Sequence, residues 1–210
     1  MTKTQEYVEH DLVREWGDPM TLQVVRRVVT GLDSEGRSAV LQDGPAANRA
    51  ETPNWPGMGV TLLWMTDEVP VDNSGNGDAA DRPFQVLPSA RGTSFIIWQC
   101  PPLSELHALS PEARARALGI DMIKAERGGS GSHPGMHATE TLDYLVLLSG
   151  ELTLLLETGE VTLHAGDTLV DRGVMHAWEN RGSSVALCVV FNVGALPLKA
   201  GGAAESALRK

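Results

Sequence analysis

Short apolar runs separated by small polar pairs constrain the fold of this chain more than any other feature. Between residues 133 and 180, runs rich in Val, Leu and Thr alternate with such pairs, namely Ser149-Gly150, Thr158-Gly159 and Gly166-Asp167. These pairs close tight antiparallel turns, and each run between them is too short to form a helix. Histidines and carboxylates lie at both ends of the segment. We therefore expect a rolled antiparallel sheet that brings the two ends together.

The preceding part of the chain continues this pattern. Strand-like runs occupy residues 22–30, 37–42, 57–66 and 92–100. Segments rich in Gly, Pro, Asn and Asp lie between them and are expected to be loops, chiefly 43–56 and 70–83. About eight to ten short strands with a single helix indicate an all-β sandwich or barrel.

The one predicted helix covers residues 110–118. Ser110 is a suitable N-cap, Pro111 suits the first helical position, and Gly119 follows as a stop signal. The domain organisation follows from the positions of the strands. We expect an N-terminal arm at 1–20, a single barrel domain at 21–198 and a flexible Gly/Ala-rich tail at 199–210.

Composition and charge narrow the classes of partner. With 17 basic and 27 acidic residues, the formal net charge of -10 argues against a nucleic-acid or anionic-membrane partner. No apolar run approaches the roughly 18 residues of a membrane span. The first ten residues lack the apolar core of a secretory signal, so a cytoplasmic location is expected. Cys100 and Cys188 lie in apolar runs and are expected to be buried free thiols.

Strand periodicity predicts a cluster of chemically active side chains. Residues two apart in a strand share a face, so His137, Thr139 and Asp143 point one way, and His176 and Trp178 share a face elsewhere. If the sheet rolls up, two imidazoles and a carboxylate converge. This donor set suits a divalent transition metal, namely Fe, Mn, Ni or Zn, and leaves coordination positions open for substrate.

Other residues extend this candidate site. His133 is a possible third imidazole ligand, and Glu140 is a further oxygen donor, although its strand parity differs from that of His137. Glu140, Asp143 and His133 are the candidate general acids or bases. The candidate substrate-binding residues are Thr139, Trp98 and Trp178. Tyr144 has the opposite parity and is expected to face away.

A purely structural alternative remains open for the same residues. His137 would then hydrogen-bond across strands, and Asp143 would pair with Arg172 or cap a turn. His10, His107 and His164 are expected to be surface residues.

The pattern of glycines and histidines resembles the two signatures of the cupin superfamily. The second signature is matched by Gly166, Gly173, His176 and Asn180, with Asp171 and Arg172 where Pro is usual. In the first signature His137 matches, Thr139 stands in place of a second His, Asp143 replaces Glu, and Gly150 closes the motif. The resemblance implies a double-stranded β-helix, or jelly-roll barrel, and a homodimer formed by exchange of edge strands.

The resemblance also implies what the chain does. The leading hypothesis is a metal-dependent enzyme that acts on a small organic acid or polyketide-like metabolite. It would be a decarboxylase or dehydratase, with the metal as Lewis acid. The first alternative is an Fe(II) dioxygenase of an aromatic or diketone substrate, and the second is a non-catalytic cupin that binds a small ligand. The loops at 43–56 and 67–91 are expected to shape specificity.

Overall fold

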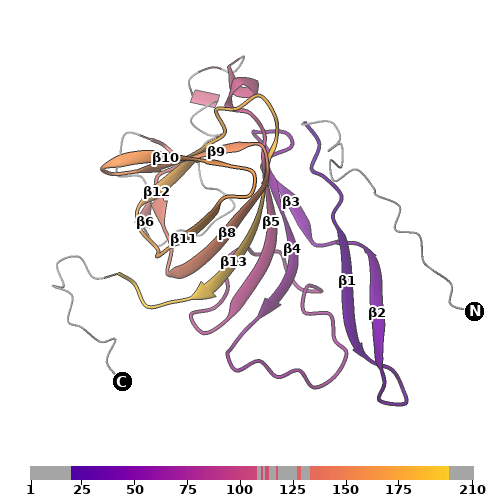
Figure 1. Ribbon diagram of the computed structural model, residues 1–210. Coiled ribbons are helices and arrows are strands. Elements are labelled where there is room, and N and C mark those ends of the chain that lie inside the picture. The colour runs from indigo at the N-terminus through magenta and orange to yellow at the C-terminus, as the bar shows by residue number, and fades with distance from the viewer. Residues whose placement is uncertain are drawn as a thin grey trace, which may run out of the picture.

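The computed structural model describes residues 20–107, 110, 112–113, 117, 127–128 and 133–198, and these form an almost entirely β-structure (Figure 1). The first five strands are β1 (Arg26–Leu32), β2 (Ser38–Pro45), β3 (Arg49–Glu51), β4 (Gly59–Thr66) and β5 (Thr93–Cys100). The next four are β6 (Arg127–Gly128), β7 (His137–Ala138), β8 (Thr141–Ser149) and β9 (Glu151–Leu156). The last four are β10 (Gly159–His164), β11 (Thr168–Asp171), β12 (His176–Glu179) and β13 (Ala186–Gly194). The prediction of an all-β fold is confirmed.

Two larger sheets and one hairpin organise these strands. A six-stranded sheet has the order β11-β8-β13-β5-β4-β3, and a five-stranded sheet has the order β10-β9-β12-β7-β6. Strands β3, β4 and β5 therefore complete the sheet that the C-terminal half begins, as expected. The β1–β2 hairpin forms a separate two-stranded sheet beside it (Figure 1). Its turn is held by Asp33, whose Oδ1 accepts hydrogen bonds from the N–H groups of Glu35 and Arg37 at 2.9 Å.

Two sequence-based boundaries were wrong. The first strand begins at Arg26 rather than at residue 22. The predicted loop at 43–56 contains the end of β2 and all of β3, because β3 pairs with β4 through Ala50 and Val60. Its prolines flank the short edge strand without interrupting its ladder, which is why turn-like composition concealed it.

The helical parts are small. Glu112, Ala113 and Ala117 are helical, and the Ala113 N–H donates to Ser110 Oγ at 3.2 Å, which confirms Ser110 as an N-cap. The other positions of the predicted helix, Pro111 among them, lie outside the described residues. A 3₁₀ helix at Leu103–Leu106 was not predicted. None of the helices in the described part of the chain has the length and apolarity that crossing a membrane requires.

The core lies between the two larger sheets. Ile96 and Cys100 face inward beside Trp98, as their alternation predicts, and meet Leu152 of the opposite sheet. Cys100 and Cys188 are buried and free, so the prediction for both thiols is confirmed. Tyr144, with the opposite parity, is exposed. The homodimer stays a prediction.

Gly173 fixes how the turn after β11 sits on the rest of the fold. Its φ of 71° is in the left-handed region, and a Cβ placed there would lie 2.5 Å from the carbonyl oxygen of Thr139. The turn that joins β11 to β12 therefore lies directly against the connection between β7 and β8. This close approach sets Asp171 and His176 beside His137.

We predict that Gly173→Ala destabilises the protein by about 3 kcal/mol or more. Left-handed backbone costs an L-residue about 1–2 kcal/mol, and the clash with Thr139 adds the cost of displaced backbone. Gly36→Ala is the matched control, because Gly36 has φ 76° and nothing within 4 Å of its Cβ position. Denaturant unfolding measures both variants. If both variants lost the same free energy of unfolding, the close packing at Gly173 would contribute nothing to stability.

Candidate functional site

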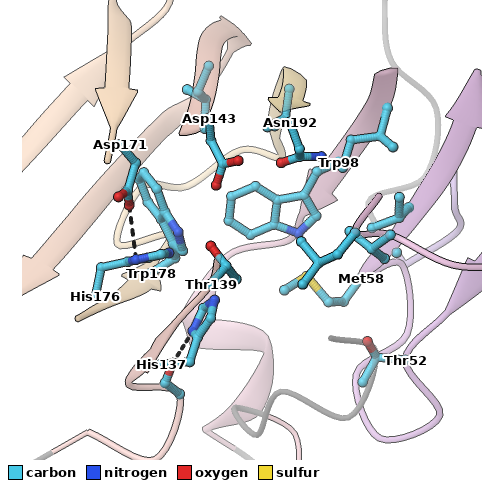
Figure 2. Close-up of a pocket in the computed structure, with 18 of the residues that line it drawn as sticks. Thr52, Met58, Trp98, His137, Thr139, Asp143, Asp171, His176, Trp178 and Asn192 are labelled. Carbon is cyan, nitrogen blue, oxygen red and sulfur yellow. Dashed lines mark hydrogen bonds and ion pairs between the residues drawn. The ribbon is translucent and has the colours of Figure 1, made fainter. Parts of the chain in front are cut away.

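A cavity of about 150 Å³ lies between the two larger sheets and is walled mostly by apolar side chains. Most of its polar lining lies at one side, from His137, Thr139, Asp143, Asp171, His176 and Asn192, whereas Thr52 lies at the other (Figure 2). The two candidate specificity loops both reach it. Thr52 and Trp55 come from 43–56, and Val86 and Leu87 come from 67–91.

His137 and His176 form the centre of the polar side. They are directly paired across β7 and β12, and their ring centroids lie 4.4 Å apart. The two ends of the segment 133–180 therefore meet, as the alternating pattern predicted. Asp143, Thr139, Trp98 and Trp178 line the same cavity.

Both imidazoles are anchored through Nδ1. His137 Nδ1 lies 2.8 Å from the carbonyl oxygen of Gly135, and His176 Nδ1 lies 2.9 Å from that of Val174. Because a backbone carbonyl can only accept, each Nδ1 carries the proton. The second nitrogen of each ring, Nε2, is left to act on a ligand.

Asp171 also belongs to the site, although the sequence did not predict it as a functional residue. It stands where the second cupin signature usually has Pro. Its Oδ2 lies 2.9 Å from His176 Nδ1, and both side chains are 5% exposed. Its Oδ1 accepts the N–H groups of Gly173 and Val174 at 2.8 and 3.1 Å. The Asp-x-Gly spacing, typical of a turn closed by the Asp side chain, was the signal that could have found it.

The contact between Asp171 Oδ2 and His176 is chiefly electrostatic. The His176 Nδ1–H is directed toward Val174, and Asp171 Oδ2 has no aligned donor. Burial lowers the pKa of His176, but contact with Asp171 outweighs burial, so the pKa is raised overall. Burial raises the pKa of Asp171, and the contact with His176 together with the backbone N–H groups lowers it overall. The contact therefore favours the imidazolium form of His176 and the carboxylate form of Asp171.

The pKa of His137 is shifted in the opposite direction to that of His176. Burial, followed by the neighbouring His176 charge, lowers the pKa of His137 to about 4. Its imidazole is therefore neutral at neutral pH, although its ring lies next to a charged one.

Asp143 is a buried carboxyl group beside another carboxylate. It is the direct cross-strand partner of Asp171, and its Oδ1 is buried without a hydrogen-bond partner among the described residues. Burial raises the pKa of Asp143 to about 6, the Asp171 charge adds to the rise, and a hydrogen bond from Thr141 opposes it. One strand pair thus holds two carboxyl groups whose pKa values are pushed apart. The alternative pairing of Asp143 with Arg172 is not among the ion pairs of the described residues.

The structure does not bring His133 or Glu140 to the cavity. His133 sits in a turn closed by the Met136 N–H, and its Nε2 lies 3.3 Å from Glu179 Oε1. Glu140 lies in the short connection between β7 and β8, outside both strands. Neither residue is among those that line the cavity. His107 and His164 are exposed as expected, and His10 lies outside the described residues.

The donor set fits a metal ion only in part. Two imidazoles anchored through Nδ1 are the usual arrangement of metal-ligating histidines. The third predicted donor, Asp143, lines the cavity, but within the described ranges no three His, Cys, Asp or Glu side chains are placed together so as to hold a metal ion. His137 and His176 therefore supply two of the donors that a metal ion needs, and the described residues do not complete the set.

Residues 122–192 match the family model for the cupin domain. The phomopsin biosynthesis cluster protein D of Diaporthe leptostromiformis is 46% identical over 57 residues, which are 27% of this chain and only 30% of that protein. The cupin-domain-containing oxidoreductase srdD of Neurospora crassa is 25% identical over 169 residues, covering 80% of this chain and 72% of that protein.

Among solved structures, the cupin domain of Schizosaccharomyces pombe Cnp3 aligns with a TM-score of 0.41 at 8% identity, covering 80% of this chain and 86% of that one. The family match falls on the segment that contains His137, Asp143 and His176. Residues 122–192 are therefore a cupin domain, and the all-β structure agrees with the double-stranded β-helix that the signatures implied.

Proposed function

We propose that this cupin is an enzyme of the lyase class that moves a proton on a small metabolite bound in the cavity. One observation carries the proposal: a buried carboxyl group with its pKa raised to about 6 lies beside an imidazole whose pKa is raised by Asp171. When the surroundings of two neighbouring titratable groups shift their pKa values, one group can act as general base and the other as general acid.

Asp143 is the general base in this proposal. A pKa near 6 leaves Asp143 largely ionised at neutral pH while keeping it a stronger base than an ordinary Asp. It would remove a proton from the carbon next to a substrate carbonyl.

His176 is the general acid. Its Nδ1 is occupied by Val174 and Asp171, so its Nε2–H is the group that stabilises the negative charge developing on the carbonyl oxygen. In a dehydration, the bond from the β-carbon to the hydroxyl then breaks, and the proton held by Asp143 passes to the departing hydroxide, which leaves as water. In a decarboxylation no carbon proton is removed: Asp143 takes the proton of the substrate's carboxylic acid. The bond to carbon dioxide then breaks, its electron pair moves to the same carbonyl oxygen, and protonated Asp143 delivers its proton to the carbon.

The apolar walls favour a substrate with a largely hydrocarbon body, such as a small organic acid or polyketide-like metabolite. The relatives support a metabolic role, because one is named as a protein of the phomopsin biosynthesis cluster.

A second candidate is a metal-dependent oxidoreductase, such as an Fe(II) dioxygenase. The anchoring of both imidazoles through Nδ1 favours it, and srdD is named as an oxidoreductase. His137 and His176 would hold the divalent metal, with Asp143 of the same cavity as a further donor, and the metal would supply Lewis-acid or redox chemistry.

We predict that Asp143→Asn lowers kcat by roughly 10²–10⁴-fold, the usual contribution of a general base. A panel of 3-oxo and 3-hydroxy acids, followed by carbon dioxide release or by absorbance of the conjugated product, provides the assay. Tyr144→Phe is the control, since Tyr144 is on the same strand and faces outward. Full activity of Asp143→Asn would rule out the base assigned here. A wild type that binds but converts none of the panel would favour the binding-module alternative.

We predict that Asp143→Asn is also more stable than the wild type at neutral pH. Because its folded pKa of about 6 exceeds the ordinary value of 3.8, Asp143 favours folding most below about pH 4, and that contribution is lost as pH rises through 6. The stability gap between variant and wild type should therefore widen by roughly 2 kcal/mol from pH 4 to pH 8. Denaturant unfolding in the presence of a chelator measures it, with exposed Asp81→Asn as control. Parallel curves for all three proteins would contradict the raised pKa.

Metal content separates the two candidates. The oxidoreductase predicts near-stoichiometric transition metal in the purified wild type and its loss in folded His137→Ala and His176→Ala, because each removes one of two ligands. His164→Ala, an exposed histidine, should keep the metal. Elemental analysis measures this. Metal retained in both cavity variants would show that these histidines do not hold it.

A further inference from the structure

Trp55 contains a buried hydrogen-bond donor that the protein does not satisfy. Its side chain is 1% exposed, and its Nε1 has no hydrogen-bond partner in the described part of the chain. An indole nitrogen can only donate. Leaving such a group buried without an acceptor destabilises the folded state, so a native structure rarely keeps one without a reason.

The loop that holds Trp55 is fixed by its own backbone. The Thr52 N–H donates to Met58 O at 2.8 Å, the Trp55 N–H to Thr52 O at 3.2 Å, and the Met58 N–H to Trp55 O at 3.0 Å. These bonds close the segment between β3 and β4 into a compact turn. The backbone that carries Trp55 is therefore fixed, and the indole itself is held by its burial.

Trp55 lines the same cavity as the acid and base, but from a different side. Thr52 and Met58, which bracket it, also line the cavity, and Figure 2 shows them on the side of Trp98 away from His176 and Asp171. Apolar side chains, among them Ile96, also line the cavity, and Trp98 lies between the two sides (Figure 2). A molecule that fills the cavity would meet the acid–base pair at one end and the Trp55 loop at the other.

We propose that Trp55 is a specificity-determining residue whose indole N–H donates a hydrogen bond to a neutral carbonyl oxygen of the substrate. One uncharged donor among apolar side chains cannot offset the cost of stripping water from a carboxylate, whereas it matches a carbonyl group. This inference rests on the proposed function and narrows its substrate to a mostly apolar carbonyl compound, uncharged at this end.

The size of the cavity limits the buried part of that substrate. Its volume of about 150 Å³ equals that of an engineered apolar cavity that accepts benzene. A six-membered ring with one carbonyl group is therefore a suitable probe.

Cyclohexanone and methylenecyclohexane form a matched probe pair, because they share a shape and only the ketone accepts a hydrogen bond. With the full chain labelled with ¹⁵N, we expect cyclohexanone to move the Trp55 Nε1–H resonance downfield and methylenecyclohexane to leave it near its starting shift. The resonance is assigned by its disappearance in Trp55→Phe. That variant should bind cyclohexanone roughly fivefold to tenfold more weakly, with no change for methylenecyclohexane.

Trp64→Phe is the control, since Trp64 is on β4 and is not among the residues that line the cavity. It should bind both probes as the wild type does. If Trp55→Phe does not fold, the wild-type spectra with the two probes still show whether the Trp55 Nε1–H donates to the ketone oxygen.

Two results would overturn the inference. In one, cyclohexanone shifts other cavity resonances but leaves the Trp55 Nε1–H unmoved; in the other, neither probe perturbs the cavity. The proposed chemistry fails separately, through full activity of Asp143→Asn or no turnover of the acid panel. If cyclohexanone shifts the Trp55 Nε1–H resonance but the protein converts none of the acid panel, the result would support a carbonyl ligand and reject the proposed lyase activity.

Discussion

The buried contact between Asp171 and His176 links the charge of the candidate site to the shape of the turn that contains it. Both side chains are almost completely buried, and Asp171 also accepts the two backbone N–H groups that shape the turn after β11. A buried carboxylate and imidazole stabilise each other's charged forms, and removal of either partner leaves an uncompensated charge. Burial is the main cause of both the lowered pKa of His137 and the raised pKa of Asp143. The His176 charge adds to the first shift and the Asp171 charge adds to the second, so the pair is coupled to both neighbouring groups.

The fold supplies the geometry for this contact. Pairing of β7 with β12 sets His137 directly opposite His176, and pairing of β8 with β11 sets Asp143 opposite Asp171. These two strand pairs belong to different sheets, so the site exists only where the sheets face each other around the cavity. Gly173 joins the two, because its close approach to Thr139 O leaves no room for a side chain.

Much of this arrangement follows from local sequence. Alternation along β8 and β12 predicted which residues face inward, and turn pairs predicted that His137 and His176 meet. The sequence did not reveal the role of Asp171, because a carboxylate beside Arg172 in a turn has the composition of an exposed loop. His133 and Glu140 were assigned to the site because of their nearness in sequence, but a one-residue difference in parity or a turn at Pro134 directs a side chain elsewhere. The part played by Trp55 was also beyond prediction, since only the packed structure shows that its N–H lacks an acceptor.

The protonation states of His137 and His176 decide whether the cavity contains the proposed acid–base site. Nitrogen NMR of the imidazole rings at pH 7, in protein treated with a chelator, reports the charge and tautomer of each ring. The account predicts a neutral His137 with its proton on Nδ1, and a His176 with a larger imidazolium fraction than a free histidine has at that pH. A neutral His176, or a charged His137, would contradict the acid–base site described here.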